Sequence, residues 1–277
     1  MRLGAQGRPR RAGITAAELI VYGRNPVREA NRGPRTVSRV WATKNAAREG
    51  WIEALRPVVV GAEEIEKRSG SPAHQGICAE VSEYRYASAE DLLAAPDPLL
   101  IALDQVQDPQ NLGAICRTAE CAGAAGIVVP ERRSADVTPA VCKASAGAVE
   151  HIPVARVRNL TDFLSMAKAA GCWCYGADAA GTTGYADVDY AGGVVLVLGS
   201  EGQGIRPRVA AACDALVALP VRGRIESLGV SAAAAVLLYE VARGRRGREA
   251  DARSVPSLDS DALLCQARAE DKDKPEL

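Results

Sequence analysis

The chain has 277 residues, of which 48% are hydrophobic and 25% charged, and its formal net charge is zero. This length and apolar content allow two small domains with cores of their own. No apolar run approaches the roughly twenty residues that a transmembrane helix requires, and the arginine-rich start lacks the apolar stretch of a secretory signal, so the sequence predicts a cytoplasmic protein.

The first part of the chain predicts short helices and strands in alternation. Residues 1–19 are a basic leader that we expect to be disordered, residues 20–85 a small α/β domain, and residues 86–97 a linker. Ser88 and Asp91 are spaced as a capping box for a helix in this linker. The expected helices of the small domain are residues 26–30, 46–55 and 62–68, and its expected strands are residues 37–42, 57–60 and 76–81.

From residue 98 the pattern changes to apolar runs that alternate with helical patterns, which is typical of a parallel sheet. This second domain should end near residue 246, because the charged residues 247–277 lose apolar periodicity and predict a disordered tail. Its expected strands are residues 99–103, 126–129, 152–155, 172–177, 193–198 and 216–219.

Two glycine-rich loops follow predicted strands of the second domain, within residues 199–204 and 220–231. Glycine lets the main chain approach a ligand closely, and loops at the carboxyl ends of parallel strands bind ligands. The first loop has neither the G-x-G-x-x-G spacing nor the Lys-Ser/Thr pair of a phosphate-binding loop. A flat polar small molecule therefore suits these loops better than a nucleotide phosphate, although an ordinary glycine-rich turn would fit the first loop alone.

A third segment, DQVQDPQNLGAICRTA at residues 104–119, follows another predicted strand. Asn111 is a good helix N-cap, and apolar residues recur after it at helical spacing. Arg117 lies about one and a half turns into this helix, away from its most apolar face. By themselves, Asn111 would be a cap and Arg117 a surface charge.

Charge is unequally distributed along the chain. Residues 1–85 carry 15 Lys and Arg against 9 Asp and Glu, whereas the remaining residues carry 19 against 25. A basic first part joined to an acidic second part suggests that the first part meets nucleic acid, although an ordinary solvated surface could have the same count.

Eight cysteines and two histidines are scattered without metal-ligand spacing or a C-x-x-C pair. Most of the cysteines lie in apolar surroundings, which is typical of reduced core residues. We therefore expect no metal site. The two isolated histidines and the lack of a G-x-S-x-G motif disfavour a serine hydrolase.

Together the three segments resemble the SpoU (TrmH-like) class of SPOUT methyltransferases. The matching motifs are N-x-G-x-x-x-R-T within residues 111–118, L-G-S-E-G-x-G within 198–204 and P-x-x-G-x-x-E-S-L-x-V-S within 220–231, in the same order and spacing. Tyr22-Gly23 with residues 26–29, AHQGICAEV at 73–81 and the segment 129–160 look like the 23S rRNA guanosine-2′-O-methyltransferase branch of that class.

The resemblance implies an α/β fold: a SPOUT-type parallel sheet with a carboxyl-terminal trefoil knot in residues 98–246, preceded by an L30e-like RNA-binding domain in residues 20–85. It implies S-adenosylmethionine-dependent 2′-O-ribose methylation of RNA, most similar to methylation of a 23S ribosomal RNA guanosine. It also implies a homodimer formed through the carboxyl-terminal domain, and we expect the helix at residues 231–243 to contribute.

The resemblance further implies site residues. The cofactor-binding residues would be Gly199, Glu201, Gly202, Leu219, Pro220 and Leu228. The catalytic candidates are Asn111, Arg117, Glu201 and Ser227. A guanidinium stays protonated in proteins, so we expect Arg117 to hold a phosphate and stabilise the developing alkoxide, with Glu201 fixing it by a bidentate contact. Gly229 departs from the family pattern, which usually has asparagine at this position.

Two alternatives within the enzyme class remain open: a transfer RNA substrate, and a ribosomal site whose methylation confers antibiotic resistance. An alternative of another class is a non-catalytic RNA-binding protein of ribosome assembly with the same fold, which Gly229 would favour. Methyl transfer to ribosomal RNA separates the enzyme from the binding protein.

Overall fold

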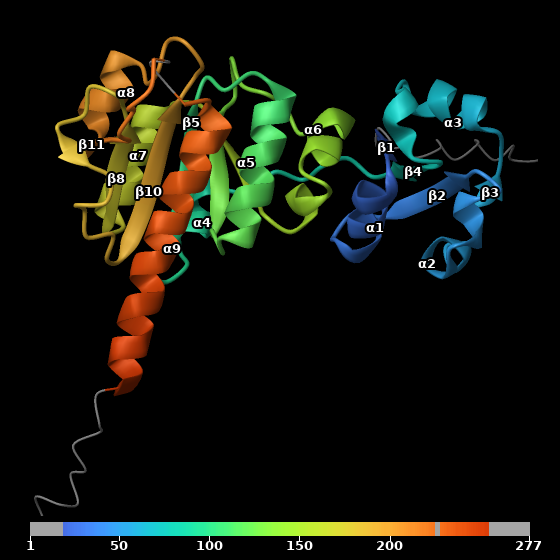
Figure 1. Cartoon of the computed structure of the whole chain (residues 1–277), viewed down its shortest axis with the longest axis horizontal. Helices are drawn as coiled ribbons and strands as arrows, with labels where there is room; N and C mark the ends of the chain where they lie inside the picture. Colours follow the sequence, from blue (N-terminus) through green and yellow to red (C-terminus); the bar gives the residue numbers. More distant parts are fainter. Residues whose placement is uncertain (1–18, 225–227, 255–277) are drawn as a thin grey trace, which may run out of the picture.

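The computed structural model describes residues 19–224 and 228–254, and the side chains of the last helix as far as residue 245. These residues form a four-stranded and a seven-stranded sheet, which lie next to one another along the long axis of the molecule (Figure 1). All but one residue of the expected leader, and most of the expected tail, lie outside the described residues.

The smaller sheet has the strand order β1-β4-β2-β3. β4 pairs antiparallel with β1 and β2, and β2 pairs parallel with β3. The expected helix over residues 46–55 is broken at Glu49, whose backbone is extended. The elements are β1 (Leu19–Tyr22), α1 (Arg24–Arg32), β2 (Val37–Ala42), η1 (Ala46–Arg48), α2 (Gly50–Glu53), β3 (Val58–Val59), α3 (Ala62–Ser69), η2 (Pro72–His74) and β4 (Ile77–Val81), where η marks a 3₁₀ turn.

A short helix, α4 (Ala89–Leu93), connects the two sheets. The Ser88 hydroxyl accepts a hydrogen bond from the Asp91 backbone N–H at 3.0 Å. This bond confirms the expected cap, because it satisfies one of the N–H groups that a helix start leaves without a partner.

The larger sheet has the order β7-β6-β5-β10-β8-β11-β9, and all its neighbours pair in parallel. This confirms the expected α/β class with a parallel sheet. Each of the six expected strands is present, but β7 begins two residues later than expected, and the two-residue β9 was not predicted. The strands are β5 (Leu99–Asp104), β6 (Gly126–Pro130), β7 (Val154–Val157), β8 (Cys172–Ala177), β9 (Thr183–Gly184), β10 (Gly193–Gly199) and β11 (Ala215–Ala218).

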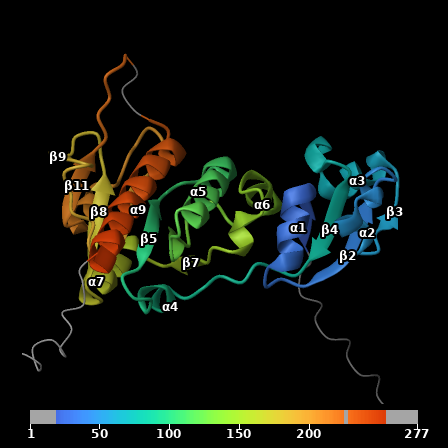
Figure 2. The ribbon, with the colours of Figure 1, turned by 60° about the horizontal axis from the view of Figure 1, so that its bottom comes forward.

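Helices cover both faces of the larger sheet, which is why its central strands are continuous apolar runs. α5 (Pro109–Cys121) and α9 (Val230–Ser254) pack on one face, and α7 (Leu160–Ala169) and α8 (Pro207–Ala212) on the other (Figure 2). α9 continues past residue 246, where the domain was expected to end.

The helix α6 (Pro139–Ala144) packs closely on α5. A Cβ atom at Gly113 would lie 2.4 Å from the Ala144 Cβ, so this position must be glycine for the two helices to approach. The glycine of the first motif therefore has a packing role.

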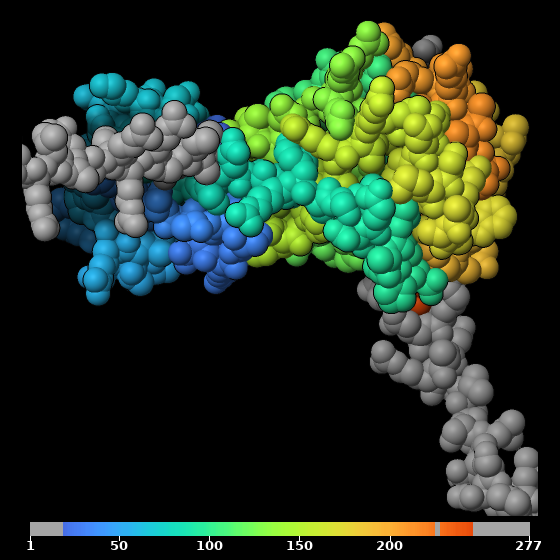
Figure 3. All heavy atoms as spheres, turned by 180° about the vertical axis from the view of Figure 1, so that it is seen from behind, coloured from blue at the N-terminus to red at the C-terminus, as the bar shows by residue number. Residues whose placement is uncertain are grey.

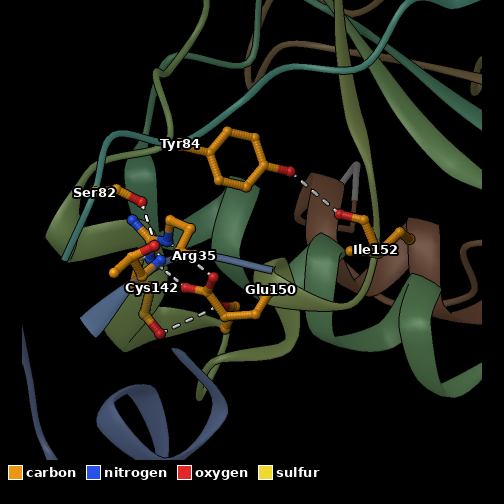
Figure 4. A network of polar contacts seen from close by, with 8 residues as sticks. Arg35, Ser82, Tyr84, Cys142, Glu150 and Ile152 are labelled. Atoms are coloured by element: carbon orange, nitrogen blue, oxygen red, sulfur yellow. Dashed lines mark hydrogen bonds and ion pairs between the residues drawn. The ribbon is translucent and has the colours of Figure 1, made fainter. Parts of the chain in front are cut away.

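A buried ion pair joins the smaller domain to the larger one (Figure 4). Arg35, between α1 and β2, donates from Nε to Glu150 Oε2 at 2.9 Å and from Nη2 to Glu150 Oε1 and to Cys142 Sγ. Glu150 ends the 3₁₀ turn η3 (Ala148–Glu150), and the two side chains are only 4% and 1% exposed. Tyr84 Oη also donates to the Ile152 carbonyl at 3.4 Å. The two domains therefore share a packed polar junction.

Candidate functional site

Loops at the carboxyl edge of the larger sheet enclose a cavity of about 450 Å³. Its walls come from the ends of β8, β10 and β11 and from the start of α9. Five of the six predicted cofactor residues line it, namely Gly199, Glu201, Gly202, Leu219 and Leu228. Pro220, the sixth, is next to Leu219 in the chain but is not a lining residue.

Gly199 determines the shape of the loop after β10. A Cβ atom there would lie 1.9 Å from the Gly204 carbonyl carbon and 2.2 Å from the Ile205 nitrogen. The loop folds back on the strand end, and Ser200 and Gly204 exchange two backbone hydrogen bonds of 3.1 and 3.0 Å. Any side chain at position 199 would displace this loop, so the glycine shapes the cavity wall itself.

A buried carboxylate fixes the other end of the same loop. Asp104, at the end of β5, has no exposed surface. It accepts hydrogen bonds from the Arg206 backbone N–H and Nε, both at 2.8 Å, and lies 2.7 Å from Nη2. The apolar run that ends in an acid was visible in the sequence, but its arginine partner 102 residues away was not. This clamp holds the loop after β10 against β5.

The first motif contacts the second at Glu201, which lines the cavity. Asn111 Nδ2 donates to Glu201 Oε1 at 3.1 Å, across 90 residues of sequence. Asn111 is not the helix cap: Asp108 is, because its Oδ1 accepts from the Gln110 N–H at 2.9 Å and α5 begins at Pro109. The expected N-cap role of Asn111 is therefore wrong, and its side chain is instead available to the site.

The predicted contact between Glu201 and Arg117 is absent in this structure. Arg117 is exposed on α5, does not line the cavity and makes no ion pair with any residue that the structure describes. Its guanidinium is therefore open to a ligand that carries negative charge. Ser227, the remaining catalytic candidate, lies outside the described residues.

The cavity suits a small cation with a flat polar group. Leu198, Val217 and Val230 supply apolar walls, while the glycine loop supplies backbone polar groups. The charged side chains among the lining residues are two acids, Asp178 and Glu201, so a phosphate would be repelled and a sulfonium attracted. The volume lies within the range of ordinary ligand pockets. Sequence reasoning missed the wall after β8, including Asp178, because that segment carries no recognisable motif.

Nucleophilic cysteine chemistry has no support at this site. Cys116, inside the first motif, is fully buried, and burial raises the pKa of its thiol far above the ordinary value. As expected, most cysteines are core residues, namely Cys78, Cys116, Cys142, Cys172 and Cys174. Among the described residues, no group of three or more His, Cys, Asp and Glu side chains could hold a metal ion, and no helix could cross a bilayer.

Comparison with known proteins identifies the class of enzyme that this sheet and cavity define. Residues 98–239 match the SpoU rRNA Methylase family, and residues 20–87 match the domain described as RNA 2′-O ribose methyltransferase substrate binding.

The relatives agree with both matches. YacO of Bacillus subtilis (strain 168), whose name places it among TrmH family tRNA/rRNA methyltransferases, is 38% identical over 81% of this chain and 95% of its own length. A protein of Mycobacterium tuberculosis (strain ATCC 25177 / H37Ra) described as an uncharacterized tRNA/rRNA methyltransferase is 41% identical over 87% of this chain and 80% of its own length. The chain belongs to the SpoU methylase family, with TrmH-family relatives.

Solved structures show the same fold. The SpoU methyltransferase AviRb from Streptomyces viridochromogenes, in complex with AdoMet, aligns with a TM-score of 0.71 at 26% identity, over 82% of this chain and 90% of its own. An AdoMet-bound rRNA methyltransferase from Sinorhizobium meliloti aligns with a TM-score of 0.69 at 28% identity, over 82% of this chain and 87% of its own. The protein is an RNA methyltransferase that uses S-adenosylmethionine.

Proposed function

We propose that this enzyme methylates the ribose 2′-hydroxyl of a guanosine in 23S ribosomal RNA. The observation that carries the proposal is a contact between two motifs. Glu201 of the second motif lines the cofactor cavity and accepts a hydrogen bond from Asn111 of the first motif. The substrate-binding match over residues 20–87 supports a 2′-O-ribose target. The AHQG segment supports ribosomal RNA, and processing of that RNA would take place in the cytoplasm.

The proposed roles follow from the charges in the site. S-adenosylmethionine supplies an electrophilic methyl group when bound. Asn111 holds one oxygen of Glu201, and the other oxygen makes no hydrogen bond with the described residues, so it is free to accept one from the target hydroxyl. Arg117 remains protonated and binds the phosphate beside the target, where it stabilises the negative charge that develops on the 2′-oxygen. Holding the hydroxyl in line with the methyl group supplies much of the rate.

Mapping of 2′-O-methyl groups in all ribosomal and transfer RNA, from cells with and without the gene, tests the target. We expect one 23S guanosine to lose its methyl group when the gene is deleted. Loss confined to transfer RNA would refute the 23S assignment. Purified protein that binds unmodified 23S RNA but transfers no labelled methyl group to it would favour the assembly-factor alternative.

The quaternary structure is also a proposal. Val236 and Tyr239 are 38% and 49% exposed and lie one turn apart on α9, whereas Leu238 is buried in the core. We propose that this exposed apolar strip forms part of a homodimer contact, as the family resemblance implies. Sedimentation of the wild type at micromolar concentration should give a dimer, and Tyr239→Lys should shift it toward monomer. A fully active wild-type monomer would refute the dimer.

The proposed domain functions and topology complete this assignment. We propose that residues 20–85 bind RNA, that residues 86–97 act as the linker, and that the sheet of residues 98–246 carries a trefoil knot. The basic surplus of residues 1–85 supports RNA binding.

A further inference from the structure

The segment between β6 and α6 contributes nothing to the cofactor cavity, although it belongs to the stretch 129–160 that carries part of the family resemblance. It leaves the sheet at Pro130 and projects at the top of Figure 1, between the cavity loops and the smaller domain. Figure 3 shows the same light-green projection from behind, beside the orange loops of the cavity. The segment thus lies between the two parts that an RNA substrate must reach.

The base of this loop is held firmly. The Ser134 hydroxyl donates to the Pro130 carbonyl, the Ala135 N–H to the Val106 carbonyl at 2.9 Å, and the Val137 N–H to Tyr86 Oη at 2.9 Å. Ala135 and Val137 are each only 6% exposed. The loop tip is therefore presented from a fixed position.

Two arginines occupy the tip. Arg132 and Arg133 are exposed and make no ion pair or side-chain hydrogen bond with the described residues. The acids nearest in sequence are Glu131, also exposed, and Asp136, which is paired with Arg156. Arg133 has a left-handed backbone with φ of 59°, which is uncommon for a residue with a Cβ atom.

Lys143 of α6 lies nearer the smaller domain than the loop tip does, at the domain junction. Its ammonium group stands 5.9 Å from the centroid of the Tyr22 ring and makes no ion pair with the described residues. A Cβ atom at Gly23 would lie 2.6 Å from Lys143 Nζ and 3.1 Å from Gln75 Oε1. Burial lowers the pKa of Lys143, and no carboxylate offsets this effect. The segments 22–23, 73–81 and 129–160, which carry the finer family resemblance, thus meet around the ammonium group of Lys143.

Two other cations of the larger domain are paired with carboxylates. Arg206 binds Asp104, and Lys168 binds Asp214 at 2.9 Å. A phosphate that binds a paired cation must compete with its carboxylate, whereas Arg132, Arg133 and Lys143 have no such competitor. Cations of this kind dominate the affinity of proteins for nucleic-acid backbones.

We propose that Arg132, Arg133 and Lys143 bind phosphates of the RNA strand that runs from the target ribose to the smaller domain. This inference rests on the proposed function, because it takes the substrate to be an RNA that reaches both domains. These phosphate contacts would contribute affinity and orient the RNA, while other residues would recognise its bases.

Salt dependence of RNA binding tests this surface. The probe is unmodified 23S ribosomal RNA transcribed in vitro, titrated with full-length protein between 50 and 200 mM salt. Each lost phosphate contact should lower the slope of log affinity against log salt by about 0.7–0.9. The double variant Arg132→Ala/Arg133→Ala should therefore lose about 1.4–1.8 of slope, and Lys143→Ala about half of that. Lys143→Arg should keep the wild-type slope.

Lys168→Ala is the matched control, because Lys168 lies in the last turn of α7, at the opposite, amino edge of the sheet. It should leave the slope unchanged, and all variants should bind S-adenosylmethionine with wild-type affinity. Wild-type slopes in the double variant and in Lys143→Ala would overturn the inference while leaving the proposed function intact. Reduced slopes together with a wild type that methylates no 23S RNA would instead refute the proposed function and keep the surface.

Discussion

The Arg35–Glu150 pair at the domain junction predicts a large loss of stability when only its negative charge is removed. Glu150→Gln keeps the shape of the side chain but leaves the Arg35 guanidinium buried without a counter-ion. The side chain of Arg35 is 4% exposed, and its Nη1 already has no hydrogen-bond partner among the described residues. The hydrogen bond from Arg35 to Cys142 Sγ, which the substitution leaves in place, is weak.

The magnitude follows from the burial of both groups. Breaking a buried ion pair by removing one partner costs about 3–5 kcal/mol. Removing both partners in favour of apolar groups of similar volume, as in Arg35→Met/Glu150→Leu, should recover most of that loss. The exposed pair Arg68–Glu64 on α3 supplies the matched control, because its side chains are 37% and 40% exposed. Glu64→Gln should cost at most about 1 kcal/mol.

Urea unfolding followed by circular dichroism measures these differences, and coincident transitions by a second probe establish two-state behaviour. Hydrogen exchange of the Glu150 region in each variant shows whether the loss is local to the junction. Two results would refute the claim that each buried charge of this pair needs the other. One is a Glu150→Gln variant that loses no more stability than Glu64→Gln, and the other is a double apolar variant that is less stable than Glu150→Gln.

Other predictions concern the site. Gly199→Ala should abolish S-adenosylmethionine binding in calorimetry, because its methyl group would overlap the backbone at Gly204. The wild type should bind S-adenosylmethionine without a metal ion, and binding that requires a divalent ion would refute this. Arg117→Ala should lower the single-turnover rate of methyl transfer by about 10²–10³-fold with little change in cofactor affinity. Arg117→Lys should also transfer methyl groups slowly, because an ammonium group cannot replace the planar guanidinium. A wild-type rate in Arg117→Ala would show that Arg117 is a surface charge without a role in the reaction. Iodoacetamide should label the exposed Cys121 of the native protein far faster than Cys116, as peptide mapping would show; equal rates would contradict the fold around α5.

The strands of the larger sheet were predictable because burial on both faces makes each one a continuous apolar run. β5 and β10 are buried along almost their whole length and were placed to within a residue. β7 was placed too early because Ile152 is also buried, although it belongs to the domain junction. β1 and β9 escaped notice because a strand of four or two residues gives no measurable alternation, and its partner lies far away in the sequence.

The site was predictable only as a set of motifs. Gly199, Glu201 and Leu228 line one cavity as the resemblance implied. The pairing within the site was not predictable, because the first motif offers Glu201 two partners, Asn111 and Arg117, and only the packing of the chain decides between them. The helix start was misplaced for a local reason: Asp108, just before Pro109, caps α5 and leaves the Asn111 side chain free to meet Glu201.

This pairing also bears on the glycine that replaces the usual asparagine at position 229. Among the described residues, and leaving out its chain neighbours, the one heavy atom within 4 Å of a Cβ built at Gly229 is Glu201 Oε1, at 3.7 Å, the same oxygen that accepts from Asn111 Nδ2. An asparagine at 229 would therefore offer its amide to the carboxylate that Asn111 already holds. In the wild-type background, Gly229→Asn should change methyl transfer by no more than about threefold, because one charge-assisted hydrogen bond to this oxygen is already made.

Asn111→Ala should lower single-turnover transfer by about 10–100-fold, the value of a hydrogen bond to a charged group. Adding Gly229→Asn to Asn111→Ala should recover a substantial part of that loss, because the new amide reaches the same oxygen from α9's side of the cavity. Cofactor affinity, measured by calorimetry in all three variants, separates a change in the carboxylate from a collapse of the pocket. If transfer is not recovered while the cofactor still binds, Asn111 acts on the substrate directly, and its contact with Glu201 is incidental.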